Sequence, residues 1–192
     1  MSVPFPPGPY KIVNYQNGNI NTARGVGPID VFPVVADSEA AVFTVSDYKP
    51  APNETLGYEV HHLVNILKGG QPANLRLDGV SETGGFPSDQ GIVAVFNNAV
   101  PNVWCIHPSD DGETNKFFRY GTKDHGPFHW HLESSKAGTF VTVNIDQDHP
   151  INKALRAHIN AGRGASLSDL TQKLKVLEKH HPDCFWHFNL LN

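Results

Sequence analysis

Short segments in which apolar and polar residues alternate occur along most of the chain. Clear cases are residues 8–14, 73–77 and 139–145. Successive side chains of a β-strand point to opposite faces, so this period of two predicts strands with one buried face. Clusters with the composition of β-turns, at 16–19, 68–71 and 110–113, separate the segments. The pattern therefore predicts an all-β chain built from many short strands.

The alternating segments form a threefold internal repeat. Three segments open with glycine followed by alternating apolar residues, at 8–14, 57–60 and 126–132. Three others close on an aromatic residue inside a short apolar strand, at 42–45, 103–106 and 185–188. Openers and closers follow one another in turn along the chain. This order predicts a single domain of three units, at about residues 8–50, 57–110 and 116–192.

The third unit carries an insertion with a helical period, from about residue 150 to residue 181. Apolar residues recur every three or four positions there, first from Ile151 and again from Leu167. Gly162 and Gly164 separate the two stripes, and Ser166 stands where a helix N-cap is expected. Pro182 ends the second stripe. We predict a helical insertion in the third unit.

Composition and charge exclude several classes of function. The chain has 192 residues, a mass of 21.1 kDa and a formal net charge of −4. It has no basic stripe, so we expect no nucleic-acid partner. No stretch approaches the roughly 20 apolar residues that cross a bilayer, and no secretory signal is seen, so we expect no membrane span and a cytoplasmic location. In that compartment Cys105 and Cys184 are expected as thiols rather than as a disulfide.

The repeat, its openers and its aromatic closers resemble a β-trefoil. In that fold the first and fourth strands of each unit close a six-stranded barrel, and the second and third strands form hairpins that cap it. The opener at 8–14 is similar to the start of fungal β-trefoil protease inhibitors (mycospins and mycocypins) and of ricin-B-like lectins. Ricin-B-like units close on Q-x-W, whereas Ala41, Asn102 and Cys184 occupy the Gln position here. The resemblance implies a non-catalytic recognition protein.

The leading functional prediction is inhibition of a protease by an exposed loop. A rigid scaffold that holds such a loop extended meets the cost of ordering it before binding. The candidate inhibitory loop contains Thr22, Ala23, Arg24 and Gly25, and Arg24 would suit a trypsin-like pocket with a buried acid. The expected partner is then a target protease. The alternative is a carbohydrate-binding lectin, whose partner is a glycan.

A histidine-rich strand offers a third hypothesis, a metal-dependent enzyme. In the segment FHWHLE at 128–133, period two places His129, His131 and Glu133 on one face. Two imidazoles and a carboxylate could hold Zn or Fe, and His125 just upstream could add a ligand. A strand with an apolar inner face and a polar outer face explains the same segment without a metal. The leading prediction therefore includes no cofactor.

Motifs of catalysis are absent from the sequence. There is no G-x-S-x-G, no H-E-x-x-H, no G-x-x-x-x-G-K and no G-x-G-x-x-G. Cys105 follows Trp104 in a predicted strand, where packing is expected rather than nucleophilic attack. The case for an enzyme therefore depends on the histidine strand alone.

Overall fold

The computed structural model describes residues 6–23, 31–50, 52, 61–77, 90–96, 103–108, 115–120 and 128–192. The strands are β1 (Gly8–Asn14), β2 (Gly18–Thr22), β3 (Val31–Ala36), β4 (Val42–Asp47), β5 (His62–Lys68), β6 (Gln71–Leu77), β7 (Gln90–Val95), β8 (Trp104–Pro108), β9 (Asn115–Tyr120), β10 (Phe128–His131), β11 (Thr142–Asn144) and β12 (Trp186–Leu190). The helices are α1 (Pro150–Ala161) and α2 (Leu167–Glu178), with short 3₁₀ turns η1 (Gly162–Gly164) and η2 (Pro182–Cys184).

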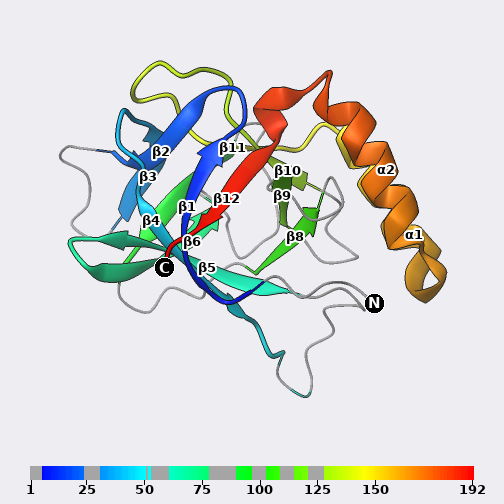
Figure 1. Ribbon diagram of the computed structural model, residues 1–192, viewed down its shortest axis with the longest axis horizontal. Coiled ribbons are helices and arrows are strands. Elements are labelled where there is room, and N and C mark those ends of the chain that lie inside the picture. The colour runs from blue at the N-terminus through cyan, green and yellow to red at the C-terminus, as the bar shows by residue number, and fades with distance from the viewer. Residues whose placement is uncertain are drawn as a thin grey trace.

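The strands β1, β4, β5, β8, β9 and β12 close a barrel. Each is antiparallel to the next, and β12 returns to β1 with Ile12 opposite Phe188. The two strands lie side by side in Figure 1, β1 in blue and β12 in red. Within the described residues, every barrel strand thus has a neighbour on both sides, as closure of a barrel requires.

The remaining strands form hairpins that cap the barrel. The pairs β2–β3, β6–β7 and β10–β11 are antiparallel, and β7 also pairs with β3 and β11. The same order of barrel strand, hairpin and barrel strand thus recurs from β1 to β4, from β5 to β8 and from β9 to β12. This topology is a β-trefoil, as the sequence pattern predicted.

Aromatic closers of the three units fill the barrel. Phe43 on β4, Trp104 on β8 and Trp186 on β12 are all fully buried. Trp130 on β10 joins them, with ring centroids 5.2 Å from Trp104 and 5.8 Å from Trp186 in edge-to-face contact. Each such ring buries roughly 150–250 Å², so these residues dominate the core. The closing aromatics that the sequence pattern identified therefore lie in the core.

The helical insertion lies between β11 and β12, at one side of the β-barrel (Figure 1). Helix α1 ends at Gly162, whose φ of 61° is in the left-handed region that favours glycine. Helix α2 begins after Ser166, whose hydroxyl accepts a hydrogen bond from the backbone N–H of Asp169 at 3.2 Å. Both features agree with the sequence prediction. Within the described residues, neither helix is long and apolar enough to span a membrane.

Residues 128–132 of the third predicted opener have a different place in the fold from the one that the pattern indicated. Phe128–His131 is β10, the second strand of the third unit, and the first strand is β9. The sequence of β9, NKFFRY, places two phenylalanines side by side and lacks clear alternation, so the pattern did not reveal it. The second opener, at 57–60, lies outside the described residues.

Candidate functional site

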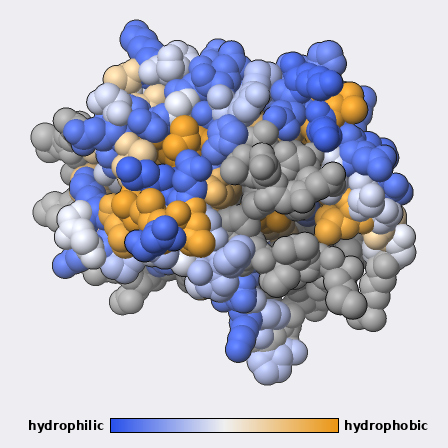
Figure 2. All heavy atoms as spheres, viewed as in Figure 1, coloured by the Kyte–Doolittle hydropathy of each residue, from blue (hydrophilic) through white to orange (hydrophobic). Residues whose placement is uncertain are grey.

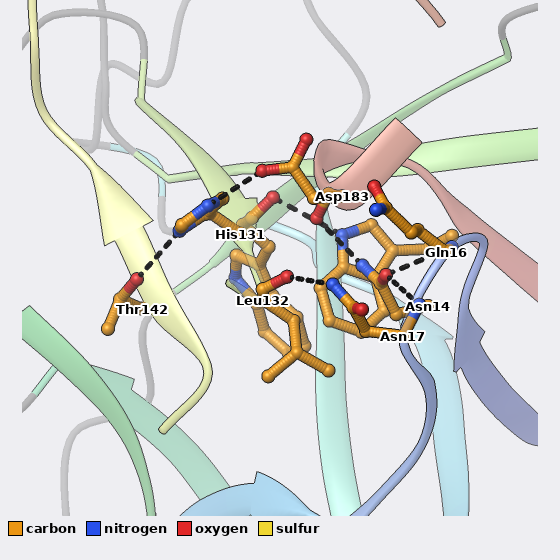
Figure 3. Close-up of polar contacts among 9 residues, drawn as sticks. Asn14, Gln16, Asn17, His131, Leu132, Thr142 and Asp183 are labelled. Carbon is orange, nitrogen blue, oxygen red and sulfur yellow. Dashed lines mark hydrogen bonds and ion pairs between the residues drawn. The ribbon is translucent and has the colours of Figure 1, made fainter. Parts of the chain in front are cut away.

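The turn between β1 and β2 is held in shape by the side chain of Asn14, which is buried. Its Oδ1 accepts hydrogen bonds from the backbone N–H groups of Gln16 at 3.2 Å and Asn17 at 2.9 Å. Its Nδ2 donates to the backbone carbonyl of Asp183 at 2.8 Å. Figure 3 shows these bonds converging on one side chain. Asn14 therefore fixes the turn and ties it to η2, which lies 169 residues away along the chain.

Further bonds join the same turn to the end of β10. The Nδ2 of Asn17 donates to the carbonyl of Leu132 at 2.6 Å, and the N–H of Leu132 donates to the carbonyl of Asp183 at 3.1 Å (Figure 3). The turn, the end of β10 and η2 thus form one hydrogen-bonded unit. Such a unit has few accessible conformations and can hold a neighbouring side chain in place.

His131, the last residue of β10, adds a side-chain link to this unit. Its Nε2 lies 2.8 Å from Oδ2 of Asp183, and its Nδ1 lies 3.3 Å from the Thr142 hydroxyl (Figure 3). The hydrogen bond from His131 is the main reason that the pKa of Asp183 is below its ordinary value, against the opposing effect of burial. Asp183 is therefore ionised at neutral pH and keeps this contact.

An exposed aromatic ring projects from the fixed turn. Tyr15 is 48% exposed, and its ring lies 5.1 Å from the ring of His187 with a tilt of 39°. Its backbone N–H donates to the carbonyl of Phe185 at 2.8 Å, which fixes the main chain beneath the ring. Gln16, next in sequence, is also exposed. We call Tyr15, Gln16 and His187 the Tyr15 platform.

Exposed apolar residues are scattered elsewhere on the described surface. The space-filling view in Figure 2 shows a mainly hydrophilic face on which hydrophobic residues gather in small separate groups. Phe140, at 52% exposed, is another large exposed aromatic residue among those described. A single exposed ring is ordinary on a protein surface. The Tyr15 platform differs because the backbone N–H groups of Tyr15 and Gln16 are hydrogen-bonded and an imidazole lies 5.1 Å from the exposed ring.

Among the described residues, the predicted ligands His129, His131 and Glu133 do not form a metal-binding group. His129 is fully buried, whereas Glu133 is exposed beyond the end of β10. Both ring nitrogens of His131 have partners, Asp183 and Thr142. His125 lies outside the described residues. The predicted polar outer face of this strand is wrong at His129, because helix α1 packs against β10 and covers it.

The predicted inhibitory loop is described only in part. Thr22 is buried and pairs with Val34 as the last residue of β2. The N–H of Ala23 donates to the carbonyl of Pro33 at 2.8 Å, so this residue also belongs to the hairpin. Arg24 and Gly25 lie outside the described residues. Protease inhibition by this loop stays a prediction.

Sequence reasoning missed a cluster of metal-binding residue types under helix α1. One ligand atom from each of His129, His149 and Cys184 lies within 4.8 Å of the others. His181 is adjacent, with its ring centroid 4.6 Å from that of His149. These residues come from β10, the start of α1 and the stretch through η2. Their spacing in sequence matches no metal-binding motif, so only the fold reveals the cluster.

Comparison with known proteins identifies the fold and no family. No protein-family model matches the chain, and no curated protein matches its sequence. The structure is similar to the ligand-binding domain of botulinum neurotoxin serotype D, solved in complex with N-acetylneuraminic acid, with a TM-score of 0.51 and 10% identity over 96% of this chain. A structure of an HCR/D mutant gives a TM-score of 0.49 and 11% identity over 97% of this chain. This chain covers 41% and 42% of those two chains. The similarity supports the β-trefoil fold.

Proposed function

We propose that this protein is a non-catalytic recognition protein that binds a carbohydrate at the Tyr15 platform. The observation that carries the proposal is an exposed tyrosine ring on a hydrogen-bonded turn, with an imidazole 5.1 Å from the ring and an exposed primary amide on the next residue. The protease-inhibitor hypothesis has less support, because the described part of its loop, Thr22 and Ala23, is held within a hairpin.

The chemistry of the platform matches the chemistry of a sugar ring. A pyranose has an apolar face of C–H groups and a rim of hydroxyl groups. The Tyr15 ring offers an apolar face for stacking, while its hydroxyl can bond at the edge. The amide of Gln16 offers both donors and an acceptor. The His187 ring, 5.1 Å from that of Tyr15, extends the aromatic surface. The platform can therefore contact both parts of a saccharide at once.

The fixed turn also lowers the cost of binding. Ordering a flexible loop or side chain on association costs affinity, and preorganisation avoids part of that cost. The Asn14 side chain accepts hydrogen bonds from two backbone N–H groups of the turn. The Tyr15 N–H donates to the carbonyl of Phe185, the residue before β12. A shallow site with few contacts benefits most from such rigidity.

The structural comparison supports the same class of ligand. The matched protein shares the fold and was solved with N-acetylneuraminic acid bound. At 10% identity the two proteins share the fold alone. Saccharides that end in N-acetylneuraminic acid are therefore one group among several to be tested.

A glycan array followed by calorimetric titration tests the proposal. We expect binding of at least one saccharide class, a loss of about tenfold or more in affinity for Tyr15→Ala, and retention of most affinity for Tyr15→Phe, which keeps the ring. Phe140→Ala is the matched control, because it removes a similarly exposed aromatic ring from the segment that bridges to Val35 on β3. This variant should bind as the parent does.

Two outcomes would overturn the proposal. One is the absence of any saccharide signal together with stoichiometric inhibition of a protease that Arg24→Ala abolishes. The other is saccharide binding that survives Tyr15→Ala and is lost in Phe140→Ala, which would move the site to the cap hairpins. Circular dichroism of each variant separates loss of binding from loss of fold.

A further inference from the structure

The cluster under helix α1 brings together nitrogen and sulfur ligands of a metal ion. The ligand atoms of His129, His149 and Cys184 lie within 4.8 Å of one another. In a tetrahedral zinc site, bonds of about 2.0–2.3 Å place neighbouring ligand atoms roughly 3.3–3.7 Å apart. Shifts of about an ångström would therefore bring all three onto one ion. The observed cluster is close to the geometry that a metal site requires.

The orientation of His129 is fixed by a buried amide. The Nδ1 of His129 lies 2.8 Å from Oδ1 of Asn152, and the Nδ2 of Asn152 donates to the carbonyls of Asn144 at 3.0 Å and Asp146 at 2.7 Å. These two donated bonds show which end of the amide is oxygen. His129 must then carry its proton on Nδ1, which leaves a lone pair on Nε2.

That lone pair has no hydrogen-bond partner among the described residues. His129 is fully buried, and its Nε2 is enclosed by protein. A buried acceptor without a partner destabilises the folded state, because it has lost its bonds to water and gained none in return. A metal-ligating histidine typically donates its other ring N–H to an oxygen, which orients the ring and raises its basicity. Asn152 does this for His129, so the imidazole is already arranged as a ligand.

Cys184 supplies the sulfur. Its side chain is a free thiol, 1% exposed, at the end of η2. Burial is the main cause of its raised pKa, with the negative charge of Asp183 adding to the effect. Such a thiol is a poor nucleophile, so the cluster is not suited to covalent catalysis. A bound cation removes this obstacle to ionisation, because a coordinating thiol gives up its proton.

The His149 ring lies close to the rings of both His129 and His181. The His149 ring centroid lies 4.7 Å from that of His129 and 4.6 Å from that of His181. No acidic residue belongs to the three-residue group in the described part of the chain. Imidazole and thiolate ligands suit zinc, whereas calcium and magnesium require oxygen.

We propose that His129, His149 and Cys184 bind one Zn²⁺ ion, with the fourth position facing His181. Binding replaces the thiol proton of Cys184 by a sulfur–zinc bond and releases that proton to solvent, with no change of oxidation state. The ion would join β10, the start of α1 and η2. Its role is structural: it would lock the helical insertion onto the trefoil. The site is separate from the Tyr15 platform and does not depend on the proposed function.

Cobalt provides a direct probe of this site. The purified full chain is treated with a chelator, dialysed and titrated with Co²⁺, then with Zn²⁺. We expect one Co²⁺ per chain, a thiolate-to-cobalt charge-transfer band in the near ultraviolet, and loss of both signals when Zn²⁺ displaces the cobalt. Surface histidines alone cannot produce the thiolate band.

Two cysteine variants form a matched pair. Cys184→Ser should abolish the thiolate band and weaken zinc binding by more than about 100-fold. Loss of a residue that only hydrogen-bonds to a metal ligand costs up to about 100-fold, so a larger loss indicates a direct ligand. Cys105→Ser removes the other buried cysteine, on β8 outside the cluster, and should retain the band. His149→Ala provides a second test at a half-buried position, should Cys184→Ser fail to fold.

The proposal is overturned if the folded parent chain binds Co²⁺ without a thiolate band. Equal loss of the band in Cys105→Ser and Cys184→Ser would also contradict it, as would full zinc affinity in a folded His149→Ala variant.

Discussion

The Nε2 atom of His131 lies 2.8 Å from Oδ2 of Asp183, although 52 residues separate them. The backbone carbonyl of the same aspartate accepts bonds from Asn14 and Leu132. Asp183 therefore connects η2 to β10 through its side chain and to the β1–β2 turn through its main chain. The chain leaves the trefoil for the helical insertion after β11, and this aspartate secures its return.

The His131–Asp183 contact should contribute measurably to stability. Both side chains are largely shielded, at 23% and 29% exposed. A double-mutant cycle of His131→Ala and Asp183→Asn, followed by urea unfolding, should give a coupling of about 1–2 kcal/mol. The same cycle on the exposed pair Lys153–Asp148, 3.7 Å apart, should give a value near zero. Equal couplings for the two pairs would contradict this account.

Asn14 should affect both stability and the proposed saccharide site. Asn14→Ala removes three side-chain hydrogen bonds, and we expect a loss of about 2–3 kcal/mol in the free energy of unfolding. Under native conditions it should also weaken saccharide binding, because the turn beneath Tyr15 is freed. Asn19→Ala, which removes one exposed bond to Ser38, is the control and should change neither quantity appreciably. A loss of stability with unchanged affinity would show that the turn does not preorganise Tyr15.

Acid should destabilise the protein through His62. Burial, the largest cause, lowers the folded-state pKa of His62 below 6.5, with the nearby Asp47 acting in the opposite direction. Below about pH 6.5 the unfolded chain then binds more protons than the folded chain. The free energy of unfolding therefore keeps its full value above that pH and falls as the pH decreases. The slope from one such group is at most about 1.4 kcal/mol per pH unit. Urea unfolding at pH 7.5 and pH 5.5 should show a smaller decrease for His62→Gln than for the parent. Identical pH dependence in the two proteins would exclude this role.

His181 and its neighbour separate the proposed metal site from general histidine binding. His181 lies beside His149, whereas His180 is exposed and outside the cluster. We expect His181→Ala to lower zinc affinity by about tenfold or more, and His180→Ala to leave it unchanged. Competition with a chromophoric chelator measures both. An equal effect of the two substitutions would point to a surface contribution.

Zinc binding should also be detected at the start of helix α1. The Nδ1 of His149 accepts a hydrogen bond from the N–H of Ile151 at 3.2 Å. Coordination through Nε2 would place a proton on that Nδ1, and coordination through Nδ1 would occupy its lone pair, so either mode removes the acceptor. Adding Zn²⁺ should therefore shift the Ile151 amide resonance and speed its hydrogen exchange, while raising Tm. An unchanged Ile151 amide at saturating zinc would exclude His149 as a ligand.

The fold was largely accessible from the sequence because it repeats. Phe43, Trp104 and Trp186 recur at equivalent places, and the change of period at residue 150 marks the insertion. Strand β9 escaped prediction because its adjacent phenylalanines do not alternate. The local pattern therefore predicted those strands in which buried and exposed residues alternate.

The candidate sites were much less accessible. The period of two correctly predicted that Trp130 lies in the core, but it predicted that His129 faces solvent. His129 is buried instead, because helix α1, which begins 21 residues later, covers it. The hydrogen bond between His129 and Asn152 and the proximity of Cys184 depend on that docking, which no local pattern encodes. The Tyr15 platform likewise depends on β12 returning beside β1, which brings His187 to the turn.

Closure of the barrel by β1 and β12 has a consequence for the order of folding. These strands pair from Tyr10 opposite Leu190 to Asn14 opposite Trp186. The first barrel strand therefore cannot complete its pairing until the last one has been synthesised. During synthesis from the N-terminus, β1 through β11 emerge before the ring can close. Contacts so distant in sequence form slowly, and unpaired strands invite association with other chains in the meantime. Nascent chains stalled before residue 186 should therefore remain sensitive to protease and engage chaperones.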